Sequence, residues 1–123
     1  NLANIVWAYA TAGIDAPQLY VAVAAEASKK MVRFSAQDMA MTAWAFATAD
    51  AEAPKLFAAI ALEAPRKMST FTAQNLANTA WAFSTVGAAQ PQLFSALAAE
   101  AAGKVASFKA QELANTVWAF ASA

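Results

Sequence analysis

The sequence predicts an all-α protein, a right-handed α-solenoid of stacked helical hairpins with three hairpins and one terminal helix. The first observation is a stretch that occurs four times, with its tryptophan at Trp7, Trp44, Trp81 and Trp118. Each step is 37 residues, and residues 38–74 and 75–111 agree at 19 of 37 positions. The second is composition: hydrophobic residues, many of them alanine, make up 60% of the chain and charged residues only 13%. Such a period is typical of arrays whose units each pack on their neighbours.

We expect the chain to form one helical-repeat array over residues 1–123. The repeats are expected at 1–37, 38–74 and 75–111, followed by a partial repeat at 112–123. The chain starts without methionine inside a repeat and stops inside another, so we expect it to be a piece of a longer protein.

The first helix of each unit is predicted to start at a capping box. Ser35 is followed three residues later by Asp38, and Thr72 is followed by Asn75, so that each pair is able to satisfy two free helical N–H groups. Lys109 takes the capping position in the last copy, where a lysine side chain offers no hydrogen-bond acceptor. We therefore expect the last start to be the least well defined.

A second helix follows a short turn in each unit. The first helices are expected to end at Gly13, Asp50 and Gly87, which tolerate a left-handed backbone. The second helices are expected to begin at Pro17, Pro54 and Pro91. The terminal helix without a partner is expected over Gln111 to Ala123. Pro65 lies inside a second helix and should end or bend it near Ala64.

Composition argues against several classes of function. Eight basic and eight acidic residues give a net charge of zero, so no overall field attracts nucleic acid or an anionic membrane. The chain has no cysteine, no histidine, no glycine-rich phosphate loop and no paired-carboxylate motif. We expect no enzyme activity, no metal, no cofactor and no small-molecule substrate. The longest uncharged run, Met68 to Ala99, contains many polar residues and a Gly and Pro break, which argues against a transmembrane segment.

The repeat resembles a known family. The run F-[ST]-A-Q-[DN]-x-A-x-T-A-W-A-F-[AS]-T, followed by P-x-L-F-x-A-[IL]-A-x-E-A, is similar to the octotricopeptide repeat and its relative the heptatricopeptide repeat. The 37-residue step suits the shorter variety. The resemblance implies an organellar protein of algae or protists, in a chloroplast or mitochondrion. It implies binding of single-stranded organellar RNA in support of RNA processing, stability or translation.

The polar arc of the first helices supplies the candidates for base recognition. Small and amide side chains there leave room for a base edge and exchange hydrogen bonds with it. The candidates are Asn4, Asp38, Thr42, Asn75, Asn78, Thr79, Glu112 and Asn115. The alternative is a solvated face, or a hydrogen-bond ladder between repeats formed by Gln74 and Asn78. We expect the first helices to line the concave surface, and we expect the four tryptophans to pack rather than to stack on bases.

Basic residues gather where the second helices finish, and they are candidates for contact with phosphates. They are Lys29, Lys30, Arg33, Arg66, Lys67, Lys104 and Lys109. Stabilisation of the helices explains part of this pattern, because Glu26 with Lys30, Glu63 with Lys67 and Glu100 with Lys104 have the favourable i,i+4 order.

A function of a different class is also consistent with the sequence. The chain is neutral and alanine-rich, and the open ends of an array expose apolar helix faces. The alternative is therefore a structural scaffold that contacts protein subunits of a large organellar complex, such as a photosystem, a ribosome or a respiratory assembly.

Overall fold

A computed structural model describes residues 1–88 and 90–122 of the chain. The elements are α1 (Leu2–Ala12), α2 (Pro17–Lys29), η1 (Met31–Arg33), α3 (Ala36–Thr48), α4 (Pro54–Glu63), η2 (Ala64–Thr70), α5 (Ala73–Thr85), α6 (Pro91–Gly103), η3 (Val105–Ser107) and α7 (Ala110–Ser122). Every element in these ranges is a helix or a 3-10 turn, which confirms the all-α solenoid. The terminal helix is α7, and the predicted last residue, Ala123, lies outside the described residues.

The turn inside each hairpin follows the predicted rule. Gly13, Asp50 and Gly87 have φ angles of 69°, 54° and 70°, so each lies in the left-handed region that ends a helix. Aspartate is one of the few residues with a Cβ that visit this region routinely. The second helix then begins at a proline in all three hairpins, where the missing N–H costs no hydrogen bond.

Side chains cap the N-termini of the first helices. Complete capping boxes join Ser35 with Asp38 and Thr72 with Asn75. The last start keeps half of the arrangement, because the Glu112 carboxylate accepts a 2.8 Å hydrogen bond from the Lys109 backbone N–H. Helix α7 therefore begins at the same repeat position as α3 and α5. It has only one of the two capping bonds, so it is the least completely capped of the three starts, as expected.

Pro65 ends α4 as predicted. The helix stops at Glu63, and η2 continues from Ala64 to Thr70, whereas α2 and α6 remain helical for three more residues in the same register. A proline inside the helix lacks the N–H donor and its ring clashes with the preceding turn, so the α-helical pattern cannot continue through it.

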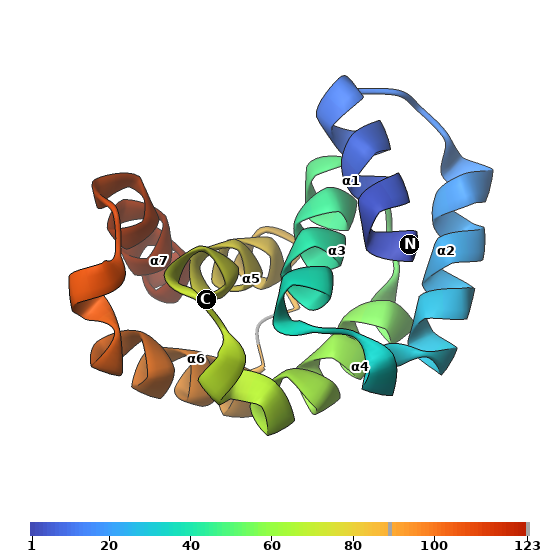
Figure 1. Ribbon diagram of the computed structural model, residues 1–123. Coiled ribbons are helices and arrows are strands. Elements are labelled where there is room, and N and C mark those ends of the chain that lie inside the picture. Colours follow the sequence, from blue (N-terminus) through green and yellow to red (C-terminus); the bar gives the residue numbers. More distant parts are fainter. Residues whose placement is uncertain (89, 123) are drawn as a thin grey trace.

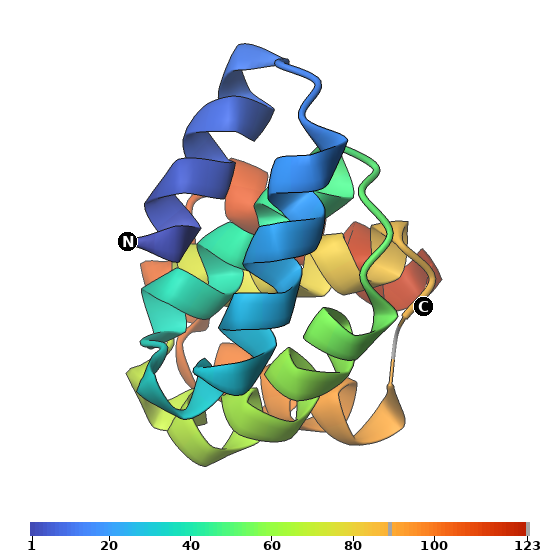
Figure 2. The ribbon, with the colours of Figure 1, turned by 90° about the vertical axis from the view of Figure 1, so that its right-hand side faces the viewer.

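The helices form two curved layers. In Figure 1, α2, α4 and α6 follow the outside of an arc, and α1, α3, α5 and α7 lie inside it; Figure 2 gives the side view of the same stack. Each inner helix packs on the next, α1 on α3, α3 on α5 and α5 on α7. The first helices therefore line the concave side, as expected.

An aromatic pair joins each hairpin to the next inner helix. Tyr20 meets Phe46, Phe57 meets Phe83 and Phe94 meets Phe120, with ring centroids 5.1, 4.9 and 5.1 Å apart in edge-to-face geometry. Such pairs are a favoured arrangement of two rings and add to the free energy of burial. The repeated contact fixes the position of consecutive units.

Within the described ranges, the helices all fall short of the length and apolar character that crossing a bilayer requires.

Candidate nucleic-acid interface

A groove of about 440 Å³ runs across the concave side between α1, α3 and α5. Polar side chains line most of it, together with Trp7 and Met41. The amide residues in its wall are Asn4, Gln37, Gln74, Asn75 and Asn78. Amides both donate and accept hydrogen bonds, and an indole offers a stacking surface, so the groove has the chemistry that single-stranded bases require.

Two of the candidates for base recognition lie in this groove with their side chains accessible. Asn4 is exposed and Asn78 is half-buried, one on α1 and the other on α5. The equivalent position on α3 is Met41, whose sulfur accepts a 3.7 Å contact from the Gln37 amide. Asn115 takes the same repeat position on α7 and is half-buried.

Gln37 was missed by the sequence analysis, and Gln74 was named there only in the alternative of a hydrogen-bond ladder, not as a base contact. Both are exposed and line the groove. They were passed over because the candidates were chosen from positions that vary between repeats, whereas glutamine recurs at Gln37, Gln74 and Gln111. Their position on the polar arc, one turn before Met41 and Asn78, was the signal that could have found them.

The prediction that Thr42 and Thr79 contact bases was wrong, because neither side chain is able to reach a base. Both side chains are completely buried, and neither hydroxyl has a hydrogen-bond partner. The reason is geometric. A helix inside the array is covered by its hairpin partner and by the inner helices on both sides, so the buried arc is wider than in a helix that packs on one face.

Asn75, Asp38 and Glu112 each accept a hydrogen bond that caps a helix start, and their contact with bases stays a prediction. Asn75 is 8% exposed, and its side-chain oxygen accepts a 3.1 Å hydrogen bond from Thr72 N–H. Asp38 accepts a 3.0 Å bond from Ser35 N–H, and Asn1 donates to its other oxygen at 3.5 Å. These side chains hold the backbone in place, and Asn75 forms part of the groove wall rather than a free contact.

The tryptophans divide into two pairs. Trp44 and Trp81, in the middle of the array, are half-buried and pack against the core. Trp7 and Trp118, on the first and last inner helices, are 42% and 50% exposed. Packing is therefore confirmed for the middle pair only, and Trp7 presents an open ring to the groove.

Two of the predicted phosphate contacts, Lys67 and Lys104, form hydrogen bonds that hold neighbouring repeats together. Lys67 Nζ donates 2.6 Å hydrogen bonds to the carbonyl oxygens of Val32 and Phe34 in the preceding repeat. Lys104 Nζ repeats the arrangement 37 residues later, at 3.1 Å from Ser69 O and 2.6 Å from Phe71 O. Each also pairs with the glutamate four residues before it, Glu63 at 3.6 Å and Glu100 at 2.8 Å.

The remaining cations stay at the surface along the same edge. Lys29, Arg33 and Lys109 are exposed. Arg66 is 63% exposed and contacts Glu63 at 3.4 Å. Lys30 pairs with Glu26 at 2.9 Å, and its hydrogen bond and charge lower the pKa of that carboxyl. Phosphates would therefore meet a row of solvated cations at this edge.

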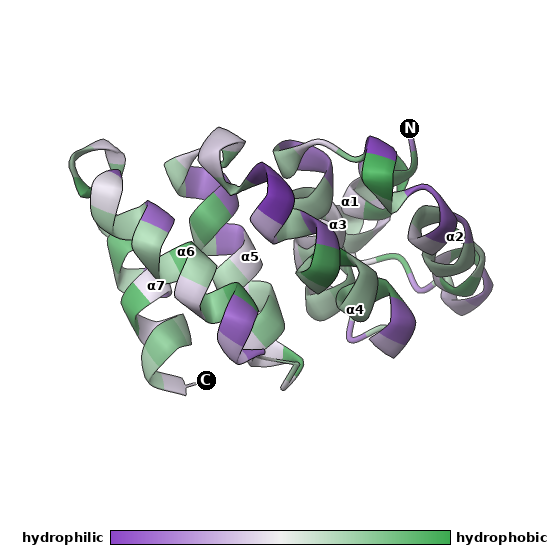
Figure 3. Ribbon diagram, turned by 90° about the horizontal axis from the view of Figure 1, so that it is seen from below, coloured by the Kyte–Doolittle hydropathy of each residue, from purple (hydrophilic) through white to green (hydrophobic). Residues whose placement is uncertain are grey.

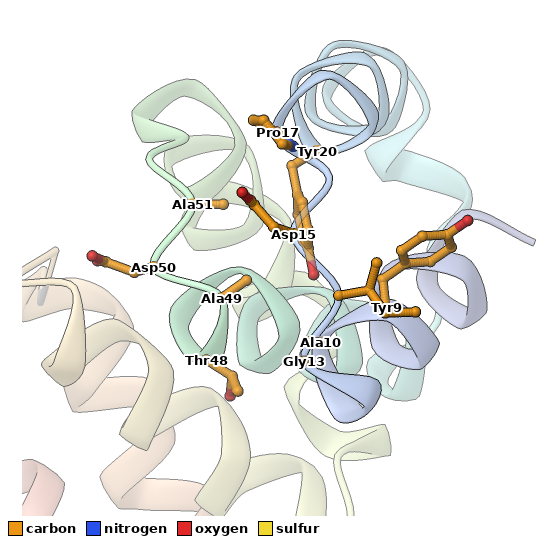
Figure 4. Close-up of a pocket in the computed structure, with 11 residues that line it drawn as sticks. Tyr9, Ala10, Gly13, Asp15, Pro17, Tyr20, Thr48, Ala49, Asp50 and Ala51 are labelled. Atoms are coloured by element: carbon orange, nitrogen blue, oxygen red, sulfur yellow. The ribbon is translucent and has the colours of Figure 1, made fainter.

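The opposite edge, where the hairpins turn, is hollowed but carries acidic groups. A hollow of about 350 Å³ lies there, and Tyr9, Asp15, Tyr20 and Asp50 are among the residues that line it (Figure 4). A similar hollow follows between the next two turns, with Asp50 and Glu52 in its wall. Carboxylates repel phosphate, so these hollows are unsuited to an RNA backbone.

Among the described residues, no cluster of side chains is suited to hold a metal ion.

Comparison with known proteins places the chain in a family. A sequence model of the RNA-editing substrate-binding complex 6 (RESC6) proteins matches residues 1–123. The chain belongs to this family. None of the curated proteins matches it. The predicted RNA-related helical family is thus confirmed, whereas the match names RESC6 and not the octotricopeptide or heptatricopeptide repeats.

Proposed function

We propose that the chain is an RNA-binding module of an RNA-editing complex in the mitochondrion. Its concave surface binds single-stranded RNA, and the chain contributes binding without catalysis of its own. The functional unit is the array over residues 1–123, in the repeats 1–37, 38–74, 75–111 and 112–123. The observation that carries the proposal is the groove in which Asn4, Gln37, Gln74 and Asn78 meet the open ring of Trp7.

The groove and the basic edge divide the binding between them. Amide side chains of the inner helices form hydrogen bonds with base edges, and Trp7 stacks on a base. Lys29, Arg33, Arg66 and Lys109 lie at the end of the hairpins where the second helices finish, and they contact phosphates. The resemblance to octotricopeptide arrays implies that side chains of successive repeats each meet one base. This arrangement supports that mode, because polar positions of consecutive inner helices follow one another along the groove.

Crosslinking of the full-length protein to RNA by ultraviolet light, followed by sequencing, tests the proposal. We expect enriched single-stranded sites that are lost when Gln74 and Asn78 are both replaced by alanine. Gln92→Ala is the matched control, because Gln92 is an exposed glutamine on the outer helix α6. Background-level crosslinking of the unmodified protein would reject the RNA-binding role.

The second candidate function is a scaffold that contacts protein subunits of the same complex. A specific observation favours it: apolar side chains are exposed on the outer helices, among them Val21 on α2 and Leu62 on α4, which are 70% and 67% exposed. A scaffold role predicts that purified complexes place this outer surface against protein while the concave surface stays free of RNA. The two functions are compatible, because they use different surfaces.

A further inference from the structure

Two hollows lie at the edge where the hairpins turn, and they occupy equivalent places in successive repeats. The first, of about 350 Å³, lies between the turns at Gly13 and Asp50. The second, of about 510 Å³, lies between the turns at Asp50 and Gly87. Each hollow has a complete hairpin of the chain on both sides, so the hollows are part of the stack itself.

The charge at this edge is negative. Figure 3 shows a stack in which hydrophilic residues form only short stretches among hydrophobic ones, so a few carboxylates decide the charge of an edge. Asp15, Asp50 and Glu52 are exposed there, and Asp50 lines both hollows. Within residues 1–88 and 90–122, none of the ion pairs uses these three carboxylates. Lys55 follows the second turn, and it lines neither hollow.

The ends of two helices add to this charge. Helices α1 and α3 both end beside the first hollow, and the C-terminus of a helix carries a partial negative charge. Helices α3 and α5 end in the same way beside the second. A cation is therefore the complementary group for both hollows.

A buried hydroxyl without a partner belongs to the lining of the first hollow. Tyr20 is 4% exposed, and its Oη has no hydrogen-bond partner. In Figure 4, its side chain extends from α2 past Asp15, and its oxygen lies among the residues that line the hollow. The hydroxyl and the Asp15 carboxylate therefore belong to one site, and a ligand with several donors is able to bond to both.

Packing does not require this hydroxyl. Phe57 and Phe94 take the place of Tyr20 in the next two repeats. Their edge-to-face contacts have centroid distances of 4.9 and 5.1 Å, against 5.1 Å for Tyr20 with Phe46. A buried hydroxyl without a partner costs free energy that phenylalanine avoids, and a ligand bonded to Tyr20 would offset that cost.

We propose that the first hollow binds an arginine side chain from an extended segment of a partner protein. The guanidinium donates one hydrogen bond to Tyr20 Oη and others to the Asp15 carboxylate. Arginine fits better than lysine, because its planar fork has five N–H donors and is less strongly hydrated than an ammonium. The second hollow binds another arginine of the same segment more weakly, because Phe57 offers no hydroxyl there.

This site is separate from RNA binding, which uses the concave surface and the basic edge. Phosphates are repelled by the carboxylates, so RNA is the wrong occupant for the turn edge. The proposal therefore holds or fails on its own, whether or not the concave surface binds RNA.

The test uses a capped, otherwise uncharged peptide with two arginines three positions apart. In a polyproline II segment such residues share a face and lie about 9 Å apart, close to the spacing of about 8–10 Å between packed helices. Calorimetry at low salt measures the affinity, and nuclear magnetic resonance shifts locate the peptide. We expect a Kd below about 1 mM and shifts at the turn amides of residues 13–16 and 49–51.

Two variants of the protein test the named contacts. Tyr20→Phe should bind about fivefold more weakly, because it lacks the acceptor while its ring packs as Phe57 does. Asp15→Asn should bind at least tenfold more weakly, because a charge-assisted hydrogen bond is lost. Circular dichroism should report a folded chain for both.

Glu26→Gln is the matched control, because it also removes one negative charge from the first repeat. Glu26 lies at the opposite edge, where it pairs with Lys30 at 2.9 Å. This variant should bind as the unmodified protein does, and a peptide with citrulline in place of arginine should not bind.

Three results would overturn the proposal. They are absence of binding to the folded protein, unchanged binding by Tyr20→Phe, and equal losses for Asp15→Asn and Glu26→Gln, which would show unspecific attraction. Self-association of the protein that Asp15→Asn abolishes would assign the hollow to a second copy instead.

Discussion

Lys67 Nζ donates a 2.6 Å hydrogen bond to the carbonyl oxygen of Phe34, and this bond ties the second repeat to the first. The Val32 carbonyl accepts a second bond of the same length, and the buried Glu63 balances the charge at 3.6 Å. The carbonyls belong to the end of η1, where helical C=O groups lack partners and attract a cation. Lys104 forms the equivalent bonds one repeat later, so the contact is part of the repeat.

The first prediction separates Lys67 from its neighbour Arg66. Lys67→Gln should lower the free energy of unfolding by about 2–3 kcal/mol, because charge-assisted hydrogen bonds are lost and the buried Glu63 keeps only its contact with the exposed Arg66. Arg66→Gln should change it by no more than about 0.5 kcal/mol, because the Arg66 side chain is 63% exposed. Urea unfolding followed by circular dichroism measures both. Equal losses would contradict a structural role specific to Lys67.

The second prediction concerns the salt dependence of RNA binding by the same two residues. For single-stranded nucleic acid, each phosphate contact adds about 0.7 to the slope of log affinity against log salt. Arg66→Gln should reduce the slope by about that amount, since its 63% exposed side chain is able to meet a phosphate. Lys67→Gln should leave the slope unchanged in the folded protein. Fluorescence anisotropy with a short single-stranded RNA, from low to physiological salt, provides the measurement.

The hydroxyl of Thr79 is the subject of the third prediction. It is buried without a hydrogen-bond partner, so Thr79→Val should raise the free energy of unfolding by about 1 kcal/mol and leave RNA affinity unchanged. Thr116→Val is the matched control on α7, where the hydroxyl donates to Glu112 O at 2.7 Å. The Thr116→Val variant should show no increase in the free energy of unfolding. A loss of RNA affinity in Thr79→Val would restore Thr79 as a base contact.

The sequence was sufficient to predict the hairpins and their limits. Gly13, Pro17, Ser35 and Pro65 act through their own backbone or through residues three or four positions away, so their effects are readable from local order. The concave placement of the first helices was favoured only because their polar face varies more between repeats than their packing face does. The period of 37 residues then implied the stack.

The candidate site was harder to predict, because burial between repeats depends on three neighbours at once. Thr79 and Asn78 are adjacent in sequence, yet only Asn78 reaches the groove. The acceptors of Lys67 lie in the preceding repeat, at Val32 and Phe34, and i,i+4 pairing with Glu63 gave no indication of them. Contacts between residues of different repeats cannot be predicted from the sequence of one repeat.

The last prediction is a pH dependence that comes from Tyr20. Burial raises the pKa of its phenol above the usual 10.0, because the hydroxyl has no partner and the phenolate would be poorly solvated. A group with a raised pKa in the folded state stabilises the protein fully below its unfolded pKa. That contribution declines as the pH rises from about 10 through the folded value.

The free energy of unfolding should therefore fall above about pH 10 in the unmodified protein. Tyr20→Phe should remove this component of the fall and retain the edge-to-face contact with Phe46. Lysines titrate in the same range, so the difference between the two proteins, rather than either curve alone, isolates the phenol. Ultraviolet titration provides a second readout, because the phenol of Tyr20 should ionise at a higher pH in the folded protein than in the unfolded chain. Parallel stability curves for the two proteins from pH 8 to pH 11 would show that Tyr20 ionises as freely in the folded chain as in the unfolded one.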